Sequence, residues 1–493
     1  MNTKKLKQLG LCALLSLSFS SCDKFLNVVP VGETTMPVLF SDMDGIRAAM
    51  PGVYAKTYDY YSSHFYLYPE IAGDLLILNL ESAGARMDIY NFNSDPDNEA
   101  GPSSKIWQEI LAALANINNA LYYLPGLEEK YPENREELAG YRAELLFLRA
   151  LAHFDLCRSY AQPYNYTADA QHIGVPILTR TPGPEDNVDR QSVKQVYDFI
   201  IEDLTAAEKI LLQLPEQRSA SVRSYYASTV AVQALLSRIF LYKEDWDRTI
   251  SYADKVTASL TLANGEDYPA MYFSLEGAEK EMIFRLNGLD KSSSIFSFFN
   301  FRTTQTDGTE IYLLPSATPS DTLLTLLDNL EDIRNTHLLF SFDSRVFTRK
   351  FDAIQTDIES NRQHINPIIL RLSEIYLNRA EAYIGKKQPA LAAADIKAIQ
   401  ARALGQAITD IELPETDLQA MTQIVYEERM RELAFEGHRL FDITRRKQNL
   451  VRDENTNSTV RELSYPSDYF VLPIPLRELD ANPNMEGNPT VNN

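Results

Sequence analysis

The sequence is poor in the residues from which metal centres, disulfide frameworks and cofactor sites are built. Among 493 residues there are three cysteines (positions 12, 22 and 157), six scattered histidines and two tryptophans. Three cysteines exclude a thiolate-rich metal site and a disulfide framework. The motifs GxSxG, HExxH, CxxC and GxGxxG and the phosphate-binding Walker loop are all absent. We therefore expect no metal site, no cofactor and no catalytic residues.

Basic residues are also few relative to acidic ones. Lys and Arg total 47 against 68 Asp and Glu, which gives a formal net charge of −21. Such a chain repels phosphate backbones, so we expect no nucleic-acid partner. The hydrophobic share of 45% and the charged share of 23% are typical of globular proteins.

The first 21 residues are typical of a secretory signal peptide. Three lysines precede an apolar segment, residues 9–19, that is too short for a membrane span of about 20 residues. Two serines then precede Cys22, as in a bacterial lipobox, where the cysteine is acylated and becomes the mature N-terminus. Phe19 stands where such motifs usually have Leu, so an ordinary signal peptide with a chance cysteine stays open.

Lipidation at Cys22 would leave a single thiol in the mature chain. Cys12 is removed with the signal peptide, and Cys157 lies in an apolar helical stretch where a free thiol behaves as a small hydrophobic group. Several acyl chains, palmitate among them, anchor a protein far more firmly than one. We expect a protein that is tethered to a membrane and not embedded in it.

Helical periodicity dominates the rest of the chain. Apolar residues that recur at spacings of three and four predict helices over residues 40–58, 106–124, 134–161, 192–214, 223–242, 246–260, 370–384, 388–403 and 417–436. Residues 58–104 and 262–369 instead contain many Tyr, Asn, Ser, Pro and Thr residues with short apolar runs. We expect long loops and a few short strands there, which is where binding function usually resides.

Two of the predicted helix pairs share a pattern that is similar to the tetratricopeptide repeat. Leu236 and Ser237 lead through a tight turn to a second helix, and Leu377 and Asn378 do the same. A single hairpin of this kind leaves one apolar face uncovered, so neighbouring hairpins must stack. Two unrelated helical hairpins are the alternative.

The densest charge cluster lies in residues 427–442. Glu427 and Arg431 are spaced as neighbours on one helix surface. The paired carboxylates of a glycosidase instead face each other across a cleft, about 5 to 9.5 Å apart. We therefore predict a structural ion-pair network, and Gly437 is expected to supply the left-handed residue that ends the helix.

Aromatic residues are concentrated in residues 58–68, at 90 and 92, and in residues 296–301. Flat amphipathic rings with Asn and Arg nearby suit sugar rings or peptide side chains, although most rings in such clusters belong to the core. The candidate ligand-binding residues are Tyr61, Tyr66, Arg86, Tyr90, Asn91, Phe296 and Phe298.

Five blocks together resemble the SusD/RagB family of outer-membrane lipoproteins, and they occur in that family's order. They are SCDKFLNVVP (21–30), FLRALAHFDLCRSYAQP (147–163), RLSEIYLNRAEAY (371–383), ERMRELAFEGHRLFDITR (428–445) and YFVLPIPLRELDANPN (469–484). The terminus EGNPTVNN departs from the family's usual Gln-Asn-Pro-Gly-Tyr.

The resemblance implies a mainly α fold, in which about four tetratricopeptide-like hairpins form a right-handed superhelical scaffold beside a loop-rich subdomain with a few short strands. The corresponding division is a signal peptide (1–21), an N-terminal helical region (22–260), a loop-rich ligand-side subdomain (261–369) and a C-terminal region that completes the scaffold (370–493).

The resemblance also implies a function. Family members lie on the cell surface at the outer membrane, bind oligosaccharides without cleaving them and deliver them to a SusC-like TonB-dependent transporter. A peptide ligand, as in RagB-like relatives, or a role as an assembly scaffold without a small ligand are alternatives. A surface glycosidase is the enzymatic alternative.

Overall fold

The computed structural model describes residues 35–81, 84–183, 185–215, 222–273, 280–288, 291, 293–304, 307, 309–351, 356–357, 362–363 and 365–489. The chain divides into two compact units between Ala49 and Met50. The first contains α3 (Met36–Leu39) and the start of α4 (Met43–Tyr60), and the second contains the remaining elements. The predicted signal peptide and Cys22 lie outside the described residues.

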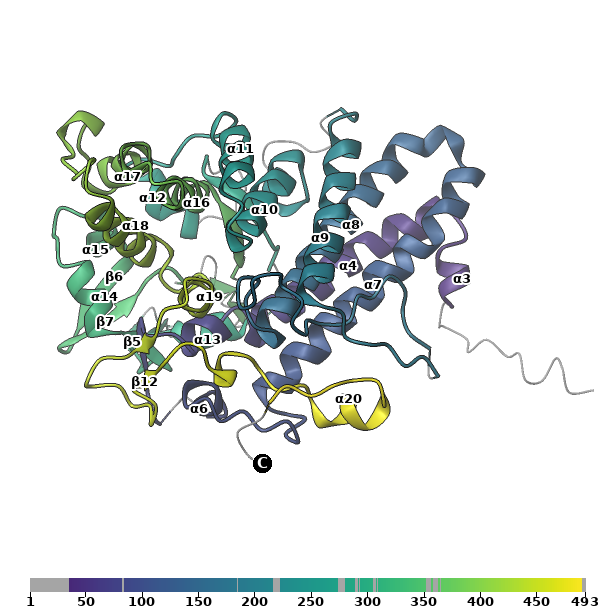
Figure 1. The fold of residues 1–493 in the computed structure, drawn as a ribbon, viewed down its shortest axis with the longest axis horizontal. Coiled ribbons are helices and arrows are strands. Elements are labelled where there is room, and N and C mark those ends of the chain that lie inside the picture. The colour runs from purple at the N-terminus through teal and green to yellow at the C-terminus, as the bar shows by residue number, and fades with distance from the viewer. Residues whose placement is uncertain are drawn as a thin grey trace, which may run out of the picture. The chain divides into compact units, whose positions relative to one another are not determined.

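Helices form most of the second unit (Figure 1). The long ones are α7 (Pro102–Lys130), α8 (Arg135–Tyr160), α9 (Val193–Leu211), α10 (Thr229–Tyr242), α11 (Trp246–Thr257), α16 (Leu372–Gly385), α17 (Pro389–Leu404) and α18 (Leu418–Leu433). The short ones are α5 (Tyr68–Ile71), α6 (Arg86–Tyr90), α12 (Asp267–Phe273), α13 (Ser294–Phe299), α14 (Asp321–Leu326), α15 (Ile333–Leu338), α19 (Arg439–Arg445) and α20 (Leu476–Ala481). Across the described part of the chain, no helix combines the length and the apolar composition needed to cross a membrane.

The nine predicted helices are all present, with shifts at their ends that have local causes. The helix predicted from residue 106 begins at Pro102, because proline fits the first turn of a helix, where its missing N–H costs nothing. The helix predicted from residue 223 begins at Thr229, because the Ser228 side chain accepts a hydrogen bond from the N–H of Ala231 and so caps the helix there. Gly437 has a φ of +81° as predicted, although α18 already ends at Leu433.

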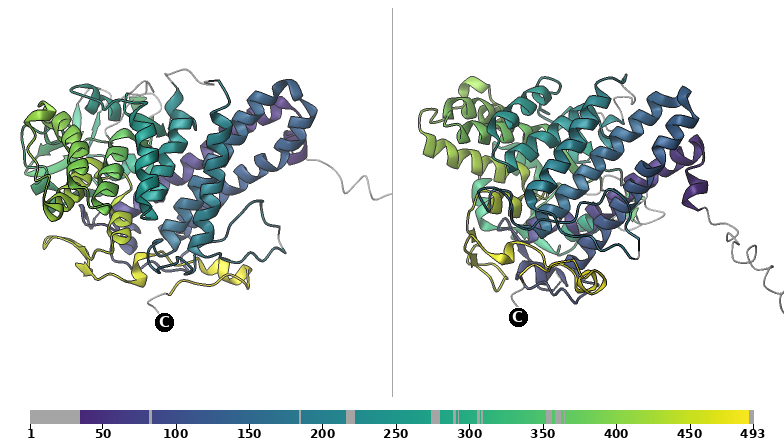
Figure 2. Two further views of the ribbon diagram at one scale, coloured as in Figure 1. Left: turned by 45° about the horizontal axis from the view of Figure 1, so that its top comes forward. Right: turned by 45° about the vertical axis from the view of Figure 1, so that its right-hand side comes forward.

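The two predicted hairpins are α10–α11 and α16–α17, and they stack on each other through α11 and α16. Figures 1 and 2 show α10 and α11 between the α16–α18 group and the group of α7, α8 and α9. Gly385, at the end of α16, permits this contact. A Cβ atom added there would lie only 2.4 Å from the Trp246 ring of α11.

A hydrophobic core joins α16, α17 and α18. Its buried residues are Leu377, Ala380, Ala392, Ala393, Ile396, Ile399, Met421, Val425 and Leu433. Small alanines alternate with larger side chains, which lets neighbouring helices approach closely and interdigitate. This packing is what the repeat-like pattern requires, since a single hairpin cannot bury its own apolar face.

The described strands are short and pair only in twos, always antiparallel. They are β1 (Leu76–Leu78) with β5 (Ala317–Pro319), β2 (Met282–Arg285) with β10 (Ile368–Arg371), β3 (Arg302–Thr304) with β4 (Glu310–Tyr312), β6 (Leu339–Phe342) with β7 (Arg345–Thr348), β8 (Thr356–Asp357) with β9 (Arg362–Gln363), and β11 (Leu450–Val451) with β12 (Glu462–Leu463). The prediction of a mainly helical chain with a few short strands is confirmed.

Residues 58–104 contain more helix than predicted. The π-helix η2 (Tyr61–Phe65), α5 and α6 occupy much of this segment. The side chains that drive them are buried, for example Phe65, Tyr68 and Ile71. Helices this short are unstable alone, so tertiary burial and not local propensity forms them.

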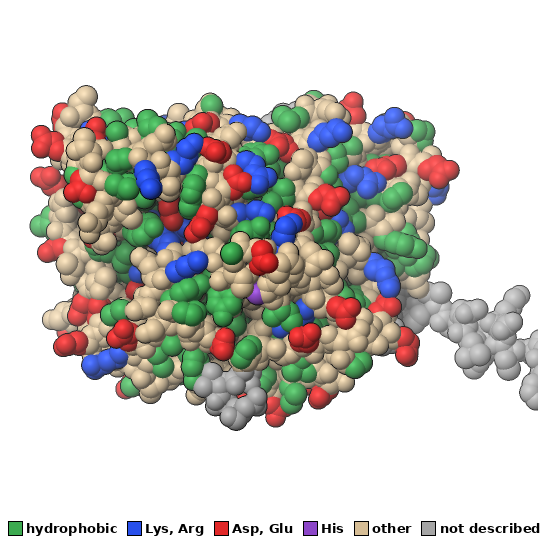
Figure 3. Space-filling model, in the orientation of Figure 1, with side chains coloured by type: hydrophobic (Ala, Val, Ile, Leu, Met, Phe, Trp, Pro, Cys, Tyr) green, Lys and Arg blue, Asp and Glu red, His purple; other side chains and the backbone are tan. Residues whose placement is uncertain are grey.

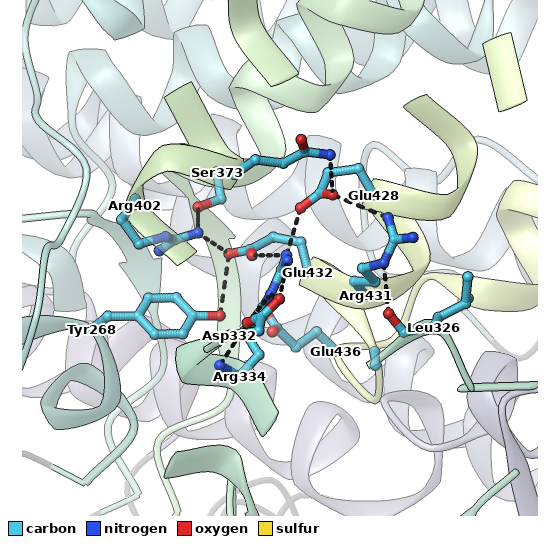
Figure 4. A network of polar contacts seen from close by, with 12 residues as sticks. Tyr268, Leu326, Asp332, Arg334, Ser373, Arg402, Glu428, Arg431, Glu432 and Glu436 are labelled. Atoms are coloured by element: carbon cyan, nitrogen blue, oxygen red, sulfur yellow. Dashed lines mark hydrogen bonds and ion pairs between the residues drawn. The ribbon is translucent and has the colours of Figure 1, made fainter. Parts of the chain in front are cut away.

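A network of buried charges joins the helical scaffold to residues from the loop-rich part of the chain (Figure 4). Glu432 of α18 accepts hydrogen bonds from Arg371 (2.7 Å), Arg402 (2.6 Å) and Arg334 (3.0 Å). Arg371, at the end of β10, also binds Glu281 (2.8 Å) and Glu436 (2.7 Å). The predicted ion-pair network is therefore confirmed, and it extends well beyond residues 427–442.

The pKa of Glu432 shows how strongly the surrounding arginines act on it. Burial raises the pKa, but Arg402, Arg371 and Arg334 outweigh burial and hold it well below its usual range. Glu432 is thus an ionised, fully paired carboxylate and not a proton donor poised near neutrality. The same holds for Glu436, whose pKa is lowered by Arg371 and Lys350 despite burial.

We expect Arg371→Met to lower the free energy of unfolding by about 3–5 kcal/mol, because it leaves three buried carboxylates without a shared cation. Urea unfolding followed by circular dichroism measures this loss. The matched control is Lys194→Met, which removes an exposed pair with Asp198 and is expected to cost less than about 1 kcal/mol. Equal effects of the two variants would contradict a structural role for the network.

A second prediction concerns acid stability. Burial raises the pKa of Glu374, but the Arg238 guanidinium outweighs it and holds the pKa at about 2. Because the folded-state pKa lies below the unfolded-state value, this pair stabilises the fold above about pH 4.5 and the stabilisation is lost as the pH falls towards 2.

Between pH 4.5 and pH 2 the free energy of unfolding should therefore fall by about 3 kcal/mol less in Glu374→Gln than in the wild type. Urea unfolding at a series of pH values measures the slope of the free energy of unfolding against pH. Glu133→Gln, at an exposed glutamate, should leave the slope as it is. An unchanged slope in the Glu374 variant would show that this carboxylate does not carry the acid sensitivity.

Candidate functional site

A cavity of about 290 Å³ opens beside α6, between segments that are far apart in the sequence. One wall contains Tyr68 of α5 and six residues at and after the end of α6, namely Ile89, Asn91, Phe92, Asn93, Ser94 and Pro96. The other wall contains the C-terminal residues Val460, Leu463, Tyr469, Val471, Leu472, Pro473 and Pro489. Figure 1 shows this C-terminal part, in yellow, close to α6. The volume lies at the lower end of the range for small-molecule pockets, about 300–1,000 Å³.

The cavity combines flat rings with hydrogen-bonding groups. Its lining residues include the aromatic Tyr68, Phe92 and Tyr469 and the polar Asn91, Asn93 and Ser94. Tyr469 is 37% exposed. Rings pack against the apolar face of a sugar or a side chain, and amides and hydroxyls bind the hydroxyl or amide groups at its edge. None of the lining residues in the described chain carries a carboxylate.

Arg452 holds the inner wall in place. Its guanidinium donates to the carbonyl oxygens of Gly73 (2.8 Å), Tyr90 (2.7 Å) and Ile71 (3.2 Å) and lies 4.2 Å from the centre of the Tyr90 ring. Burial lowers the pKa of Arg452 to about 10, so the side chain is still charged at neutral pH. A charged group bound to carbonyls of three separate residues fixes the backbone beneath the cavity.

Asn91 links the two walls. Its side-chain oxygen accepts hydrogen bonds from the hydroxyl of Ser458 (3.1 Å) and the N–H of Thr459 (2.9 Å). The next residue, Phe92, has a φ of 53°, in the left-handed region that non-glycine residues rarely adopt. Such strain persists only where surrounding contacts enforce it, and it occurs often at binding sites.

The structure buries the predicted aromatic residues of the N-terminal cluster. Tyr61 and Tyr66 are each 2% exposed and Tyr90 is fully covered. The Tyr61 hydroxyl donates to Asp155 at 2.6 Å, and that of Tyr90 lies 2.6 Å from the Thr456 hydroxyl. These rings belong to the core, and their contact with a ligand stays a prediction.

The remaining predicted residues divide in the same way. Phe296 and Phe298 of α13 are 7% and 0% exposed. Arg86, the first residue of α6, is only partly buried and lies 5.3 Å from the centre of the Phe298 ring. Asn91 is the one predicted residue that lines the cavity.

The sequence reasoning missed the C-terminal wall. Tyr469, Val471 and Leu472 belong to the block YFVLPIPLRELDANPN, whose sequence carries the family resemblance but no indication of a binding role. The available signal for this wall was a tyrosine, Tyr469, that stands next to a proline-rich apolar segment without helical periodicity. Nothing in the sequence relates it to Asn91.

A second aromatic surface lies on the β3–β4 and β6–β7 hairpins. The rings of Phe301, Phe340, Tyr312 and Phe342 stack with centroids 4.2–5.6 Å apart for the Phe301–Phe340, Tyr312–Phe340 and Tyr312–Phe342 pairs. Phe342 is 44% exposed. Exposed rings of this kind often mark interaction surfaces.

Charge is distributed without a single dominant patch on the face seen in Figure 3. Acidic and basic side chains are interspersed there, with hydrophobic side chains between them. The described residues contain no group of three or more His, Cys, Asp or Glu side chains arranged to hold a metal ion.

Two carboxyl groups near the aromatic cluster have strongly raised pKa values. Burial raises the pKa of Glu70 to about 7, although backbone N–H groups, including those of Gly437 (2.9 Å) and His438 (2.8 Å), donate to it. Burial also raises the pKa of Glu109 to about 7, against a hydrogen bond from Ser63. Glu70 and Glu109 share no hydrogen-bond donor.

Two family descriptions match the sequence over separate parts of the chain. The SusD family matches residues 340–490. A SusD-like family described as starch-binding and associating with the outer membrane matches residues 40–241. Two relatives from Formosa agariphila align over nearly the whole chain. SusD-like protein P2 is 24% identical and the alignment covers 96% of this chain and 97% of the relative, and SusD-like protein P25 is 21% identical with 99% of each covered.

Solved structures share the fold. A SusD superfamily protein from Bacteroides vulgatus is 26% identical with a TM-score of 0.73, covering 91% of this chain and 99% of the other. A SusD superfamily protein from Bacteroides thetaiotaomicron is 22% identical with a TM-score of 0.78, covering 91% and 100%. The two family matches, the full-length relatives and the shared fold agree: the chain belongs to the SusD family.

Proposed function

We propose that this protein is a cell-surface lipoprotein that captures oligosaccharides and delivers them to a SusC-like TonB-dependent outer-membrane transporter, without cleaving them. The observation that carries the binding step is the cavity beside α6, with aromatic rings and side-chain amides on its walls. The description of the matching family as starch-binding and associated with the outer membrane supports the ligand class and the location.

In this proposal the sugar rings lie against Tyr469 and Phe92, and Asn91 and Asn93 bind hydroxyl groups. The outer parts of the predicted 58–92 and 295–301 segments, Arg86 among them, face the ligand. The transporter covers the bound glycan, and a lipid at Cys22 keeps binder and transporter together at high effective concentration. The division into residues 22–260, 261–369 and 370–493 belongs to the same proposal.

A peptide ligand or a scaffold without a small ligand remains the competing proposal. The cavity favours a ligand over a pure scaffold, and its hydroxyl and amide groups suit sugars as well as peptide backbones. Parallel glycan and peptide arrays separate these cases. Incubation with glycans followed by an assay for new reducing ends tests for a glycosidase.

We expect Tyr469→Ala to weaken binding of the best glycan hit at least about fivefold, because it removes an aromatic wall of the cavity. Isothermal titration calorimetry measures the change. Tyr122→Ala, at a 72% exposed tyrosine of α7, is the matched control and should bind normally. If Phe342→Ala abolishes binding and Tyr469→Ala does not, the glycan site is the hairpin surface and the cavity assignment is wrong.

We expect cells that express the full chain to incorporate alkyne-palmitate into it, and Cys22→Ser to abolish the label. Cys157→Ala is the control and should keep the label, since this buried cysteine is a small hydrophobic group in the core. Label retained in Cys22→Ser, or a soluble wild-type protein after cell fractionation, would overturn the lipoprotein proposal. Co-purification with a SusC-like barrel tests delivery separately.

A further inference from the structure

Arg86 is a partly buried arginine that lies against an aromatic ring without a counter-ion among the described residues. Its guanidinium lies over the Phe298 ring, its Nε atom is buried, and within the described residues it has neither a hydrogen bond nor a carboxylate partner. Burial lowers the pKa of Arg86. By contrast, Arg371 and Arg402 each bind at least two carboxylates.

Two further basic side chains come from α7 and from an element that, like α6, packs against α7. His64 comes from η2 and Lys105 from α7, and elements α6 and η2 both pack against α7. Burial, together with the positive charges of Arg86 and Lys105, lowers the pKa of His64 to about 4. Among the described residues, the Lys105 ammonium donates to the Gln108 side chain (3.4 Å) and its charge lowers the pKa of Glu109, while the His64 ring has no hydrogen-bond partner.

The carboxylates nearby neutralise these groups only in part. Asp59 of α4 is already paired with Lys56 (3.0 Å) and Lys291 (3.1 Å). Glu109 of α7 accepts a hydrogen bond from Ser63 (3.1 Å), and its other carboxylate oxygen is buried with no partner in the described chain. Since burial raises the pKa of Glu109 to about 7, this group is only partly ionised at neutral pH.

A partly buried cation without a counter-ion loses some of its solvation, and perturbed charged groups of this kind cluster at functional sites. This chain has a net charge of −21, so an anionic group is held only where local positive charge outweighs repulsion from the rest of the surface. A negatively charged ligand group at Arg86 would supply the missing hydrogen-bond acceptors and counter-charge, in the bidentate geometry that guanidinium groups favour.

We propose that Arg86, Lys105 and His64, here named the Arg86 cluster, bind a negatively charged group of the captured glycan, either the carboxylate of a uronic acid or a sulfate ester. This inference rests on the proposed function and names its ligand class as acidic glycans. Arg86 begins α6 and Asn91 follows its last residue, so the five-residue helix of about 7.5 Å separates the charged subsite from the cavity.

The first experiment needs no knowledge of the natural glycan. The full-length protein with labelled histidine imidazole is titrated with sodium sulfate, sodium glucuronate and glucose at constant ionic strength, and His64 is followed by NMR. We expect sulfate, glucuronate or both to shift the His64 signal and raise its pKa, while glucose does neither. The two anions separate sulfate from carboxylate recognition. Arg86→Gln should abolish the response, and Arg248→Gln, an equal charge change at an exposed pair on α11, should retain it.

The second experiment measures binding of oligogalacturonate, sulfated carrageenan oligosaccharides and neutral maltohexaose. We expect an acidic probe to bind, with affinity that falls as salt rises, and Arg86→Gln to weaken it by about 10- to 100-fold. Tight binding of maltohexaose with no His64 response to either anion would overturn the acidic-glycan inference and leave the proposed function standing. If His64 responds to the anions but none of the glycans binds, the result would contradict the proposed glycan capture and support the anion site.

Discussion

The ion pairs between Arg371 and the carboxylates of Glu281, Glu432 and Glu436 are the contact on which the rest of the structure depends. Arg371 stands where strand β10 passes into helix α16, so it belongs both to the short-stranded region and to the helical scaffold. Its partners come from α18, the turn after it and the approach to β2. Because these charges are buried, each satisfies the others, and none can be moved without leaving a desolvated charge behind. The network therefore fixes the position of the loop-rich region relative to the helices.

Rigidity of this kind is what a binding site on loops requires. The cavity beside α6 is formed by short helices and irregular segments that have little stability of their own. Arg452 ties three backbone carbonyls beneath it, and Asn91 connects its two walls. A preorganised site loses less entropy when a ligand binds, so small contacts contribute more to affinity.

The helices could be predicted from the sequence because their signal is local. The spacing of Leu145, Leu148 and Leu156 is helical by itself and so predicts α8, in which all three are buried. The site could not be predicted in the same way. Tyr61 is a candidate ligand-binding residue by sequence, but its hydroxyl donates to Asp155, 94 residues away. Tyr469 went unnoticed because its role depends on a wall built by residues 89–96. Long-range contacts decide which aromatic residue is core and which is surface, and composition carries no record of them.

The stacking of α11 on α16 has a consequence for how the chain reaches its native state. The α10–α11 hairpin is complete once residue 257 has been synthesised, but the helix that covers its apolar side begins only at Leu372. More than a hundred residues must emerge before that surface is covered. During this interval the incomplete chain exposes the apolar side of the α10–α11 hairpin. Contacts between such distant segments slow folding. Chaperones that delay aggregation then become important.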